Sequence, residues 1–196
     1  MSRPVAVITG ASRGIGKQLC IDMAAAGYDI VAVARSSDAS PSKVLPGTVD
    51  EAVALAREAG GPGCRTIASG LDVRDEAGVK ALAERVMADF GRVDVVVNNA
   101  AISPPGATLD LPTSLWRKAT DINVHGPFYF TYYFAPLMKP GEGRIVNISS
   151  SASIHPEGDR VSYTVTKRAL EAFSEGMGYE LQGRVAVNCI RLELEV

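Results

Sequence analysis

Short runs of consecutive apolar residues alternate along the chain with longer segments in which apolar residues recur every three or four positions. Continuous, often β-branched runs are typical of strands that are buried on both faces of a parallel sheet. The pattern predicts strands over residues 5–8, 29–34, 65–71, 93–97, 144–148 and 184–190.

The segments between these strands have helical periodicity, and helices are expected over about 15–26, 49–59, 79–90, 113–138 and 163–181. Ile15, Leu19 and Met23 recur at the spacing of the core-facing side of the first helix. Thr48–Glu51 is a capping box ahead of the second helix, and Pro127 predicts a kink or irregular turn in the fourth. The alternation predicts an α/β fold, a Rossmann-type doubly wound parallel sheet with helices on both faces (three layers, α/β/α), in one domain over 1–196.

Composition excludes several classes of partner. The net charge of −2 gives no basic surface for nucleic acid or an anionic membrane, and no apolar run approaches the ~18 residues of a membrane span. The apolar stretch 5–8 is too short for a signal peptide, and the three cysteines are odd in number and far apart, so we expect a reduced, cytoplasmic protein. His125 and His155 lack metal-ligand spacing, so no metal site is expected.

A glycine-rich turn, Thr-Gly-Ala-Ser-Arg-Gly-Ile-Gly over residues 9–16, joins the first strand to the first helix. Its glycines, Gly10, Gly14 and Gly16, let the backbone turn tightly and let a pyrophosphate approach the helix N-terminus, where free N–H groups favour negative charge. The strand before the turn and the helix after it favour a dinucleotide site.

Arg35 ends the second strand, at the position that lies by the adenosine ribose in dinucleotide folds. An acid there would accept from the 2′-hydroxyl, whereas arginine suits a 2′-phosphate. With Arg13 in the glycine turn, this indicates NADP(H) rather than NAD(H), although both could be ordinary solvated surface arginines. Asp72, after the third strand, could accept from the adenine amino group or cap a helix.

Ligands of doubly wound sheets bind beyond the carboxyl ends of the strands. Gly10, Arg35, Asp72, Asn98 and Ser150 each follow a strand, so we expect them to converge on one rim. The expected cofactor-binding residues are Gly10, Ser12, Arg13, Gly14, Ile15, Gly16, Arg35, Asp72, Val73, Asn99, Ala100, Tyr163 and Lys167.

The chemistry is expected from Tyr163 and Lys167, which are four residues apart and therefore share one face of a helix. A free tyrosine has a pKa of about 10, too high for a base at neutral pH. The lysine ammonium and an oxidised nicotinamide would lower that pKa, so that Tyr163 could exchange a proton with an alcohol or carbonyl. Ser150 could then hydrogen-bond the substrate oxygen. The alternative is that Tyr163 and Lys167 are ordinary helix-surface residues.

Thr9-Gly10-x-x-x-Gly14-x-Gly16, Asn98-Asn99-Ala100, Asn123, Ser150 and Tyr163-x-x-x-Lys167 together resemble the short-chain dehydrogenase/reductase family over residues 4–190. The resemblance implies a Rossmann fold, a nicotinamide cofactor and hydride transfer between a carbonyl and an alcohol. It also implies that Lys167 holds the nicotinamide ribose and that Asn123 anchors a proton-relaying water. The loop over 36–47 is similar to that of hydroxysteroid-dehydrogenase-like members, which does not indicate a substrate.

The sequence departs from the family pattern at two places. Ala101 stands where the family usually has glycine, which could shift the loop near the cofactor. Arg191-Leu192 stands where a Pro-Gly is usual after the sixth strand. Family members usually continue beyond the equivalent of Val196, and a bare edge strand at 184–190 would invite aggregation, so we expect the domain to be incomplete at its C-terminus.

The leading hypothesis is an oxidoreductase that transfers a hydride between NADP(H) and a small alcohol or carbonyl substrate, with Asn123, Ser150, Tyr163 and Lys167 as catalytic residues. An NADP(H)-binding regulatory or scaffold protein without turnover is the alternative, and an epimerase or dehydratase of the same fold fits the glycine spacing less well. The aromatic run 128–134 predicts a homodimer or homotetramer formed through the helices 113–138 and 163–181. The resemblance implies the same, because members of the family usually form oligomers.

Overall fold

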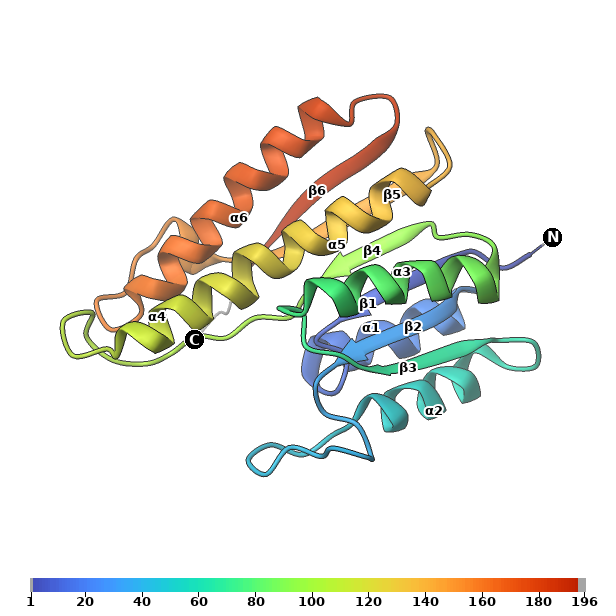
Figure 1. Cartoon of the computed structure of the whole chain (residues 1–196), viewed down its shortest axis with the longest axis horizontal. Coiled ribbons are helices and arrows are strands. Elements are labelled where there is room, and N and C mark those ends of the chain that lie inside the picture. Colours follow the sequence, from blue (N-terminus) through green and yellow to red (C-terminus); the bar gives the residue numbers. More distant parts are fainter. Residues whose placement is uncertain (1, 194–196) are drawn as a thin grey trace.

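A computed structural model describes residues 2–193 of the chain (Figure 1). Its centre is a six-stranded sheet in the order β3-β2-β1-β4-β5-β6, and every neighbouring pair is parallel. The strands are β1 (Val5–Thr9), β2 (Asp29–Ala34), β3 (Thr66–Gly70), β4 (Val95–Asn98), β5 (Gly143–Ser150) and β6 (Val185–Leu192). The predicted doubly wound sheet is confirmed, and its strand order reverses between β1 and β4, where such sheets hold their ligands.

Helices cover both faces of the sheet. The helices α1 (Gly14–Ala25) and α2 (Val49–Gly60) pack on one face, and α3 (Glu76–Phe90), α5 (Gly126–Phe134) and α6 (Val161–Glu180) lie over the other (Figure 1). Alternate residues of β1 enter the two cores, because successive strand side chains point to opposite faces. Val7 packs in the core that contains Phe130, and Ile8 in the core that contains Cys20. The expected three layers are therefore present.

The first helix buries a different side from the one that its apolar spacing suggests. The buried residues of α1 are Gly16, Cys20 and Ala24, whereas Leu19 is only partly buried and Ile15 is 50% exposed. Small side chains face the sheet because the helix lies very close to it. A Cβ added at Gly16 would lie 2.3 Å from the carbonyl oxygen of Gly10.

The predicted helix over 113–138 is interrupted. It divides into α4 (Thr113–Thr120), a π-helical turn (Asp121–His125), α5 and a 3₁₀ turn (Ala135–Leu137). The Gly126 N–H bonds to the Asp121 carbonyl, five residues back. Pro127 has no N–H to offer the Asn123 carbonyl, four residues back, so the ordinary helical pattern cannot continue there. The irregular turn predicted from Pro127 is confirmed, and it buries the side chain of Asn123.

The ends of the next helices follow their capping signals. The Thr48 hydroxyl accepts from the Glu51 N–H at the start of α2, as the capping box predicts. Asp75 caps α3 by accepting from the Gly78 N–H, so the helix-capping alternative for Asp72 is wrong. Within residues 2–193, no helix is both long enough and apolar enough to cross a membrane. The expected C-terminal continuation falls outside the described residues.

Candidate active site

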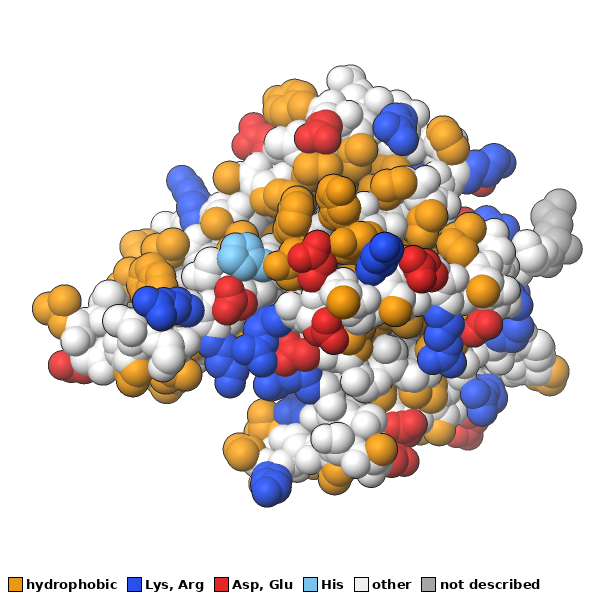
Figure 2. Space-filling model, viewed as in Figure 1, with side chains coloured by type: hydrophobic (Ala, Val, Ile, Leu, Met, Phe, Trp, Pro, Cys, Tyr) orange, Lys and Arg blue, Asp and Glu red, His pale blue; other side chains and the backbone are white. Residues whose placement is uncertain are grey.

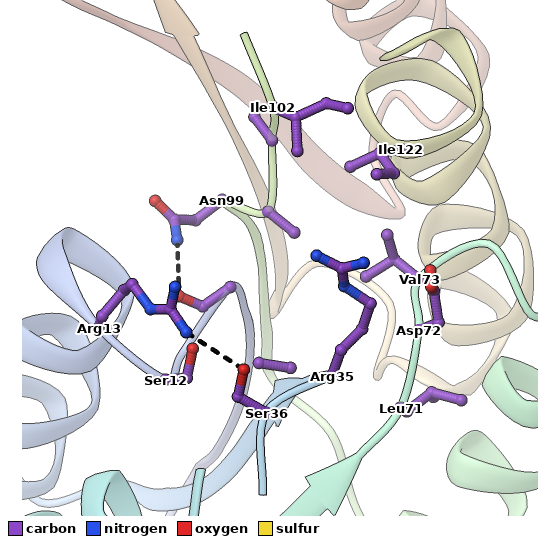
Figure 3. Close-up of a pocket in the computed structure, with 14 residues that line it drawn as sticks. Ser12, Arg13, Arg35, Ser36, Leu71, Asp72, Val73, Asn99, Ile102 and Ile122 are labelled. Carbon is purple, nitrogen blue, oxygen red and sulfur yellow. Dashed lines mark hydrogen bonds between the residues drawn. The ribbon is translucent and has the colours of Figure 1, made fainter. Parts of the chain in front are cut away.

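A cleft of about 270 Å³ opens at the carboxyl edge of the sheet, where the strand order reverses (Figure 3). The expected cofactor residues that line it are Gly10, Ser12, Arg13, Arg35, Asp72, Val73, Asn99 and Ala100. The lining residues that sequence reasoning missed are Ala34, Ser36, Leu71, Ile102 and Ile122, while Ala101, which also lines the cleft, was already placed near the cofactor. Most of these residues are next in the sequence to a residue that was predicted. Including the neighbours of each predicted residue would therefore have found most of them.

The glycine turn is shaped to bring backbone close to a ligand. Gly10 and Gly14 have φ angles of +67° and +52°, which side chains rarely adopt. Gly16 instead serves close packing, as its blocked Cβ position shows. The amide of Asn99 donates to the Thr9 carbonyl at 2.9 Å and so fastens the end of β4 to the turn.

The N-terminus of α1 has free donors that face this turn. Its first residue is preceded by Arg13, whose side chain makes no capping hydrogen bond, and its first turn contains no acidic residue. The N-termini of α2 and α3, by contrast, are capped by Thr48 and Asp75. Uncapped N–H groups and the helix dipole favour an anion here, so the chain fits a pyrophosphate.

Two arginines line the cleft, one in the glycine turn and one directly after β2. Arg13 donates to the Ser36 hydroxyl at 3.1 Å, which ties the glycine turn to the end of β2. Arg35 directs its guanidinium into the cleft, between the glycine turn and Val73 (Figure 3). The arrangement concentrates positive charge and a hydroxyl at one corner, where a phosphate group would be held.

The Asp72 carboxylate already has a partner. Arg74 donates to its two oxygens at 3.0 and 2.8 Å. Burial raises the pKa of Asp72, but the hydrogen bonds from Arg74 outweigh it, and the net shift is downward. Asp72 is thus an ionised group at the cleft wall, and acceptance from an adenine amino group stays a prediction.

The expected convergence on one rim fails for Asn98. Its amide donates to the Asn147 side chain at 2.8 Å, and the residue is only 3% exposed. Asn98 and Asn99 point in opposite directions, because adjacent residues at a strand end alternate between faces. Asn99 therefore reaches the cleft and Asn98 lies in the interior.

Tyr163 and Lys167 lie on one side of α6, as their spacing predicts. The Lys167 Nζ is 5.5 Å from the centre of the Tyr163 ring and donates to the Ile148 carbonyl at 2.6 Å. Lys167 is only 3% exposed, and burial lowers its pKa from 10.5 to about 8. The ammonium is therefore held in a buried site at the end of β5.

The pKa of Tyr163 moves in the opposite direction from the one expected. Burial raises it, while a hydrogen bond with Ser150 and the charge of Arg160 oppose that rise. Among the chain's own groups, desolvation of the phenolate outweighs the favourable contacts. Ser150 is nevertheless brought to the phenol, as the proposed chemistry requires.

Asn123 joins the cleft to the catalytic helix. Its amide oxygen accepts from the Ile102 N–H at 2.9 Å, and its nitrogen donates to the Ile102 carbonyl and to the Thr166 hydroxyl at 2.8 and 3.0 Å. The side chain is thus fully engaged. Pro127, four residues further along, has no N–H to donate to the main-chain carbonyl of Asn123. The expected role of Asn123 in anchoring a water stays a prediction.

Comparisons with known proteins agree with this arrangement. The profile of a family described as short chain dehydrogenase matches residues 4–193. Hydroxysteroid dehydrogenase-like protein 2 from Bos taurus is 33% identical over 186 residues, which cover 93% of this chain and 43% of that protein. The chain thus spans less than half the length of this curated relative.

Two solved structures illustrate both kinds of nicotinamide cofactor. A blue fluorescent protein from a metagenomic library, in complex with NADPH, is 31% identical with a TM-score of 0.84, over 97% of this chain and 74% of that one. NAD⁺-bound xylitol dehydrogenase is 25% identical with a TM-score of 0.85, over 98% of this chain and 70% of that one. The choice between the cofactors therefore has to be argued from the residues of this chain.

Proposed function

The chain belongs to the short-chain dehydrogenase family of NAD(P)-dependent oxidoreductases, and on that premise we propose that it transfers a hydride between NADP(H) and a small alcohol or carbonyl substrate. The observation that carries this proposal is the placement of Tyr163 beside the buried Lys167, whose Nζ lies 5.5 Å from the centre of the Tyr163 ring. When bound, the nicotinamide supplies or accepts the hydride.

The preference for NADP(H) rests on the charge at the ribose end of the cleft. Arg13, Arg35 and Ser36 offer two cations and a hydroxyl to a 2′-phosphate. Arg35, which directly follows β2, offers no carboxylate to a ribose 2′-hydroxyl, and Asp72 is paired with Arg74. A planar guanidinium binds phosphate through two hydrogen bonds, which a ribose hydroxyl cannot match.

The proton is moved by the chain's own residues. The Tyr163 phenol donates its proton to the carbonyl oxygen in reduction and receives one from the alcohol in oxidation. The Ser150 hydroxyl stabilises the same oxygen as charge develops on it. Lys167, with its pKa lowered to about 8 by burial, stands beside the phenol as the nearby source of positive charge. Asn123 would anchor a water that relays the proton.

The reaction is tested by following NADPH oxidation across a panel of ketones, aldehydes and acyl-chain carbonyls. Tyr163→Phe should bind NADPH as well as the native protein but lose most turnover, because the ring stays and only the exchangeable proton is removed. Tyr179→Phe, at an exposed tyrosine near the end of α6, is the matched control. NADPH binding without turnover of any carbonyl would favour the regulatory or scaffold alternative.

The cofactor preference is tested separately by titrating the protein with NADPH and NADH. Arg35→Ala and Arg13→Ala should each weaken NADPH binding and leave NADH binding nearly unchanged. Arg85→Ala, an exposed arginine on α3, controls for the general loss of a positive charge. Equal affinity of the native protein for both cofactors, or tighter NADH binding, would contradict the arginine argument.

We further propose that the chain forms a homodimer or homotetramer through α4, α5 and α6. Hydrophobic side chains gather over α5 (Figure 2), where Phe128 is 43% and Tyr132 60% exposed, and Val165 on α6 is 46% exposed. Phe128 also packs against Phe173 of α6, so the two helices present one continuous apolar surface. Light scattering should give a multiple of the chain mass, and Phe128→Glu should lower it.

The cytoplasmic setting stays a proposal that rests on the cysteines. Cys20, Cys64 and Cys189 are all free thiols in the structure. Burial raises the pKa of each of them, so none is a reactive thiolate. Protein isolated without reductant should titrate as three thiols per chain after denaturation.

A further inference from the structure

The turn that carries Ser150 is held from both sides by one carboxylate. The hydroxyls of Ser149 and Ser153 both donate to Oε1 of Glu171, at 2.7 and 2.6 Å. Both serines are buried, at 1% and 5% exposure. Ser150 lies between them, at the junction of β5 with the 3₁₀ turn Ser151–Ser153. The carboxylate thus fixes the chain immediately before and shortly after the proposed catalytic serine.

The Glu171 carboxylate is in turn fixed by Arg191, at the end of β6. The Arg191 guanidinium donates from Nε to Oε1 at 3.1 Å and from Nη2 to Oε2 at 2.9 Å, and Nε also lies 3.2 Å from the Ser153 hydroxyl. Burial raises the pKa of Glu171, but these hydrogen bonds and the arginine charge lower it to about 2. Glu171 is therefore a permanently ionised acceptor.

The position of Glu171 on α6 links this cluster to the chemistry. Glu171 is four residues beyond Lys167, so it lies one turn along the same side of the helix that carries Tyr163. The helix thus fixes the phenol directly and the serine turn through Glu171. The Ser150 oxygen accepts from the Ala152 N–H at 3.3 Å, which leaves its hydroxyl hydrogen free to be donated to the phenol or the substrate oxygen.

We propose that Glu171 is a positioning residue for the reaction: by accepting from Ser149 and Ser153, it holds the Ser150 hydroxyl toward Tyr163. This inference rests on the proposed function, in which Ser150 and Tyr163 act on the substrate oxygen. The competing explanation is that Glu171 and Arg191 form only a stabilising ion pair. Such a pair would not depend on the two serine hydroxyls, and this difference can be measured.

The test uses three changes at the cluster. Glu171→Ala removes the acceptor, Ser149→Ala combined with Ser153→Ala removes both donors but keeps the ion pair, and Glu171→Gln keeps an oxygen acceptor without the charge. Glu175→Ala, an exposed residue one turn further along α6, is the matched control. Circular dichroism and NADPH titration establish that each variant folds and binds the cofactor.

The first readout needs no substrate. The Tyr163 phenol is titrated by its near-ultraviolet absorbance, as the difference between each protein and the same protein with Tyr163→Phe. Lys167 and Arg160, the charged groups that face the phenol, are unchanged throughout. Because the Ser150 hydrogen bond lowers the pKa of Tyr163, displacing Ser150 should raise that pKa. Glu171→Ala, the double serine variant and Ser150→Ala should shift the titration upward together, and Glu175→Ala should not.

The second readout is turnover of a carbonyl found by the NADPH screen. Glu171→Ala and the double serine variant should lower kcat by up to about a hundredfold, as expected when a catalytic group moves by about 1 Å, with NADPH binding unchanged. Glu171→Gln should recover most of the loss.

Three results would overturn the proposal. One is a double serine variant with native kcat and a native Tyr163 titration. Another is Glu171→Gln as impaired as Glu171→Ala, and the third is a Tyr163 titration that responds to Ser150→Ala but not to Glu171→Ala. If no carbonyl is turned over, the proposed function fails, while the titration still decides whether Glu171 positions Ser150.

Discussion

Replacing Lys167 by methionine should make the protein more stable at neutral pH, although it removes a proposed catalytic residue. Methionine has a similar length, carries no charge and suits an apolar site. Lys167 is 3% exposed and has no carboxylate partner among the ion pairs of residues 2–193. Its ammonium donates a hydrogen bond to the Ile148 carbonyl at 2.6 Å.

The magnitude follows from the lowered pKa. Burial lowers the pKa of Lys167 from 10.5 in the ordinary case to about 8. At about 1.4 kcal/mol per pKa unit, the charged form destabilises the folded state by about 3 kcal/mol. Loss of the hydrogen bond to Ile148 destabilises the variant by about 1 kcal/mol or more. Lys167→Met is therefore expected to be about 1–2 kcal/mol more stable than the native chain at neutral pH.

The pH dependence has a definite sign. Because the folded-state pKa lies below the unfolded-state value, the penalty is fully present below pH 8 and disappears as the pH rises toward 10.5. In that window the unfolded state binds more protons, so the native chain gains stability relative to Lys167→Met. Tyr163 and Cys189, which face Lys167, have pKa values raised by burial and stay neutral through the lower part of the window.

The assay is urea unfolding of both proteins, without added cofactor, followed by circular dichroism at a series of pH values across this window. The difference between the two unfolding free energies isolates Lys167 from the other titrating groups. Lys80→Met makes the same chemical change at an exposed position of α3 and is the matched control. A Lys167→Met difference that does not change with pH, or a Lys167→Met variant less stable than the native chain at neutral pH, would refute the argument that the buried ammonium is destabilising.

Three further variants test the fold around the cofactor cleft. Gly16→Ala should destabilise the protein by about 1–3 kcal/mol and weaken NADPH binding, because its Cβ would lie 2.3 Å from the Gly10 carbonyl oxygen. An unchanged melting temperature and an unchanged affinity for NADPH would count against close packing of α1. Thr48→Ala should lower the unfolding free energy by about 1 kcal/mol in urea, since the Glu51 N–H loses its cap, while Thr48→Ser should retain it. Asn147→Ala should cost about 1–3 kcal/mol in the same assay, because the buried Asn98 amide on β4 would lose its acceptor and the Ser174 hydroxyl on α6 would lose a donor. A loss no larger than that of an exposed Asn188→Ala would contradict this.

The apolar pattern was sufficient to predict the strands, the alternation with helices and therefore the fold class. A strand that is buried on both faces needs apolar side chains at nearly every position. It can therefore be recognised in the sequence as a mostly continuous apolar run such as 29–34. The side of α1 that faces the sheet could not be predicted in this way. Hydrophobic spacing favours Leu19, but the short distance between α1 and the sheet selects Gly16 and Cys20 for their size.

The order of the strands was decided only by tertiary structure. The sequence indicates six strands, but their neighbours, and with them the reversal between β1 and β4, depend on pairing between segments far apart in the chain. The same pairing turns Asn98 inward and Asn99 to the cleft. A register shifted by one residue would exchange their places.

In the candidate site, too, some features could be predicted from the sequence and others depend on the tertiary structure. Local sequence was enough to indicate the glycine turn, the Tyr163–Lys167 pair and Arg35, because each depends on backbone conformation or on spacing within one element. The contact of Ser36 with Arg13, the lowered pKa of Lys167 and the Glu171 cluster join residues from separate elements. Desolvation and hydrogen bonding depend on the distances between those elements, and only the folded chain determines these distances.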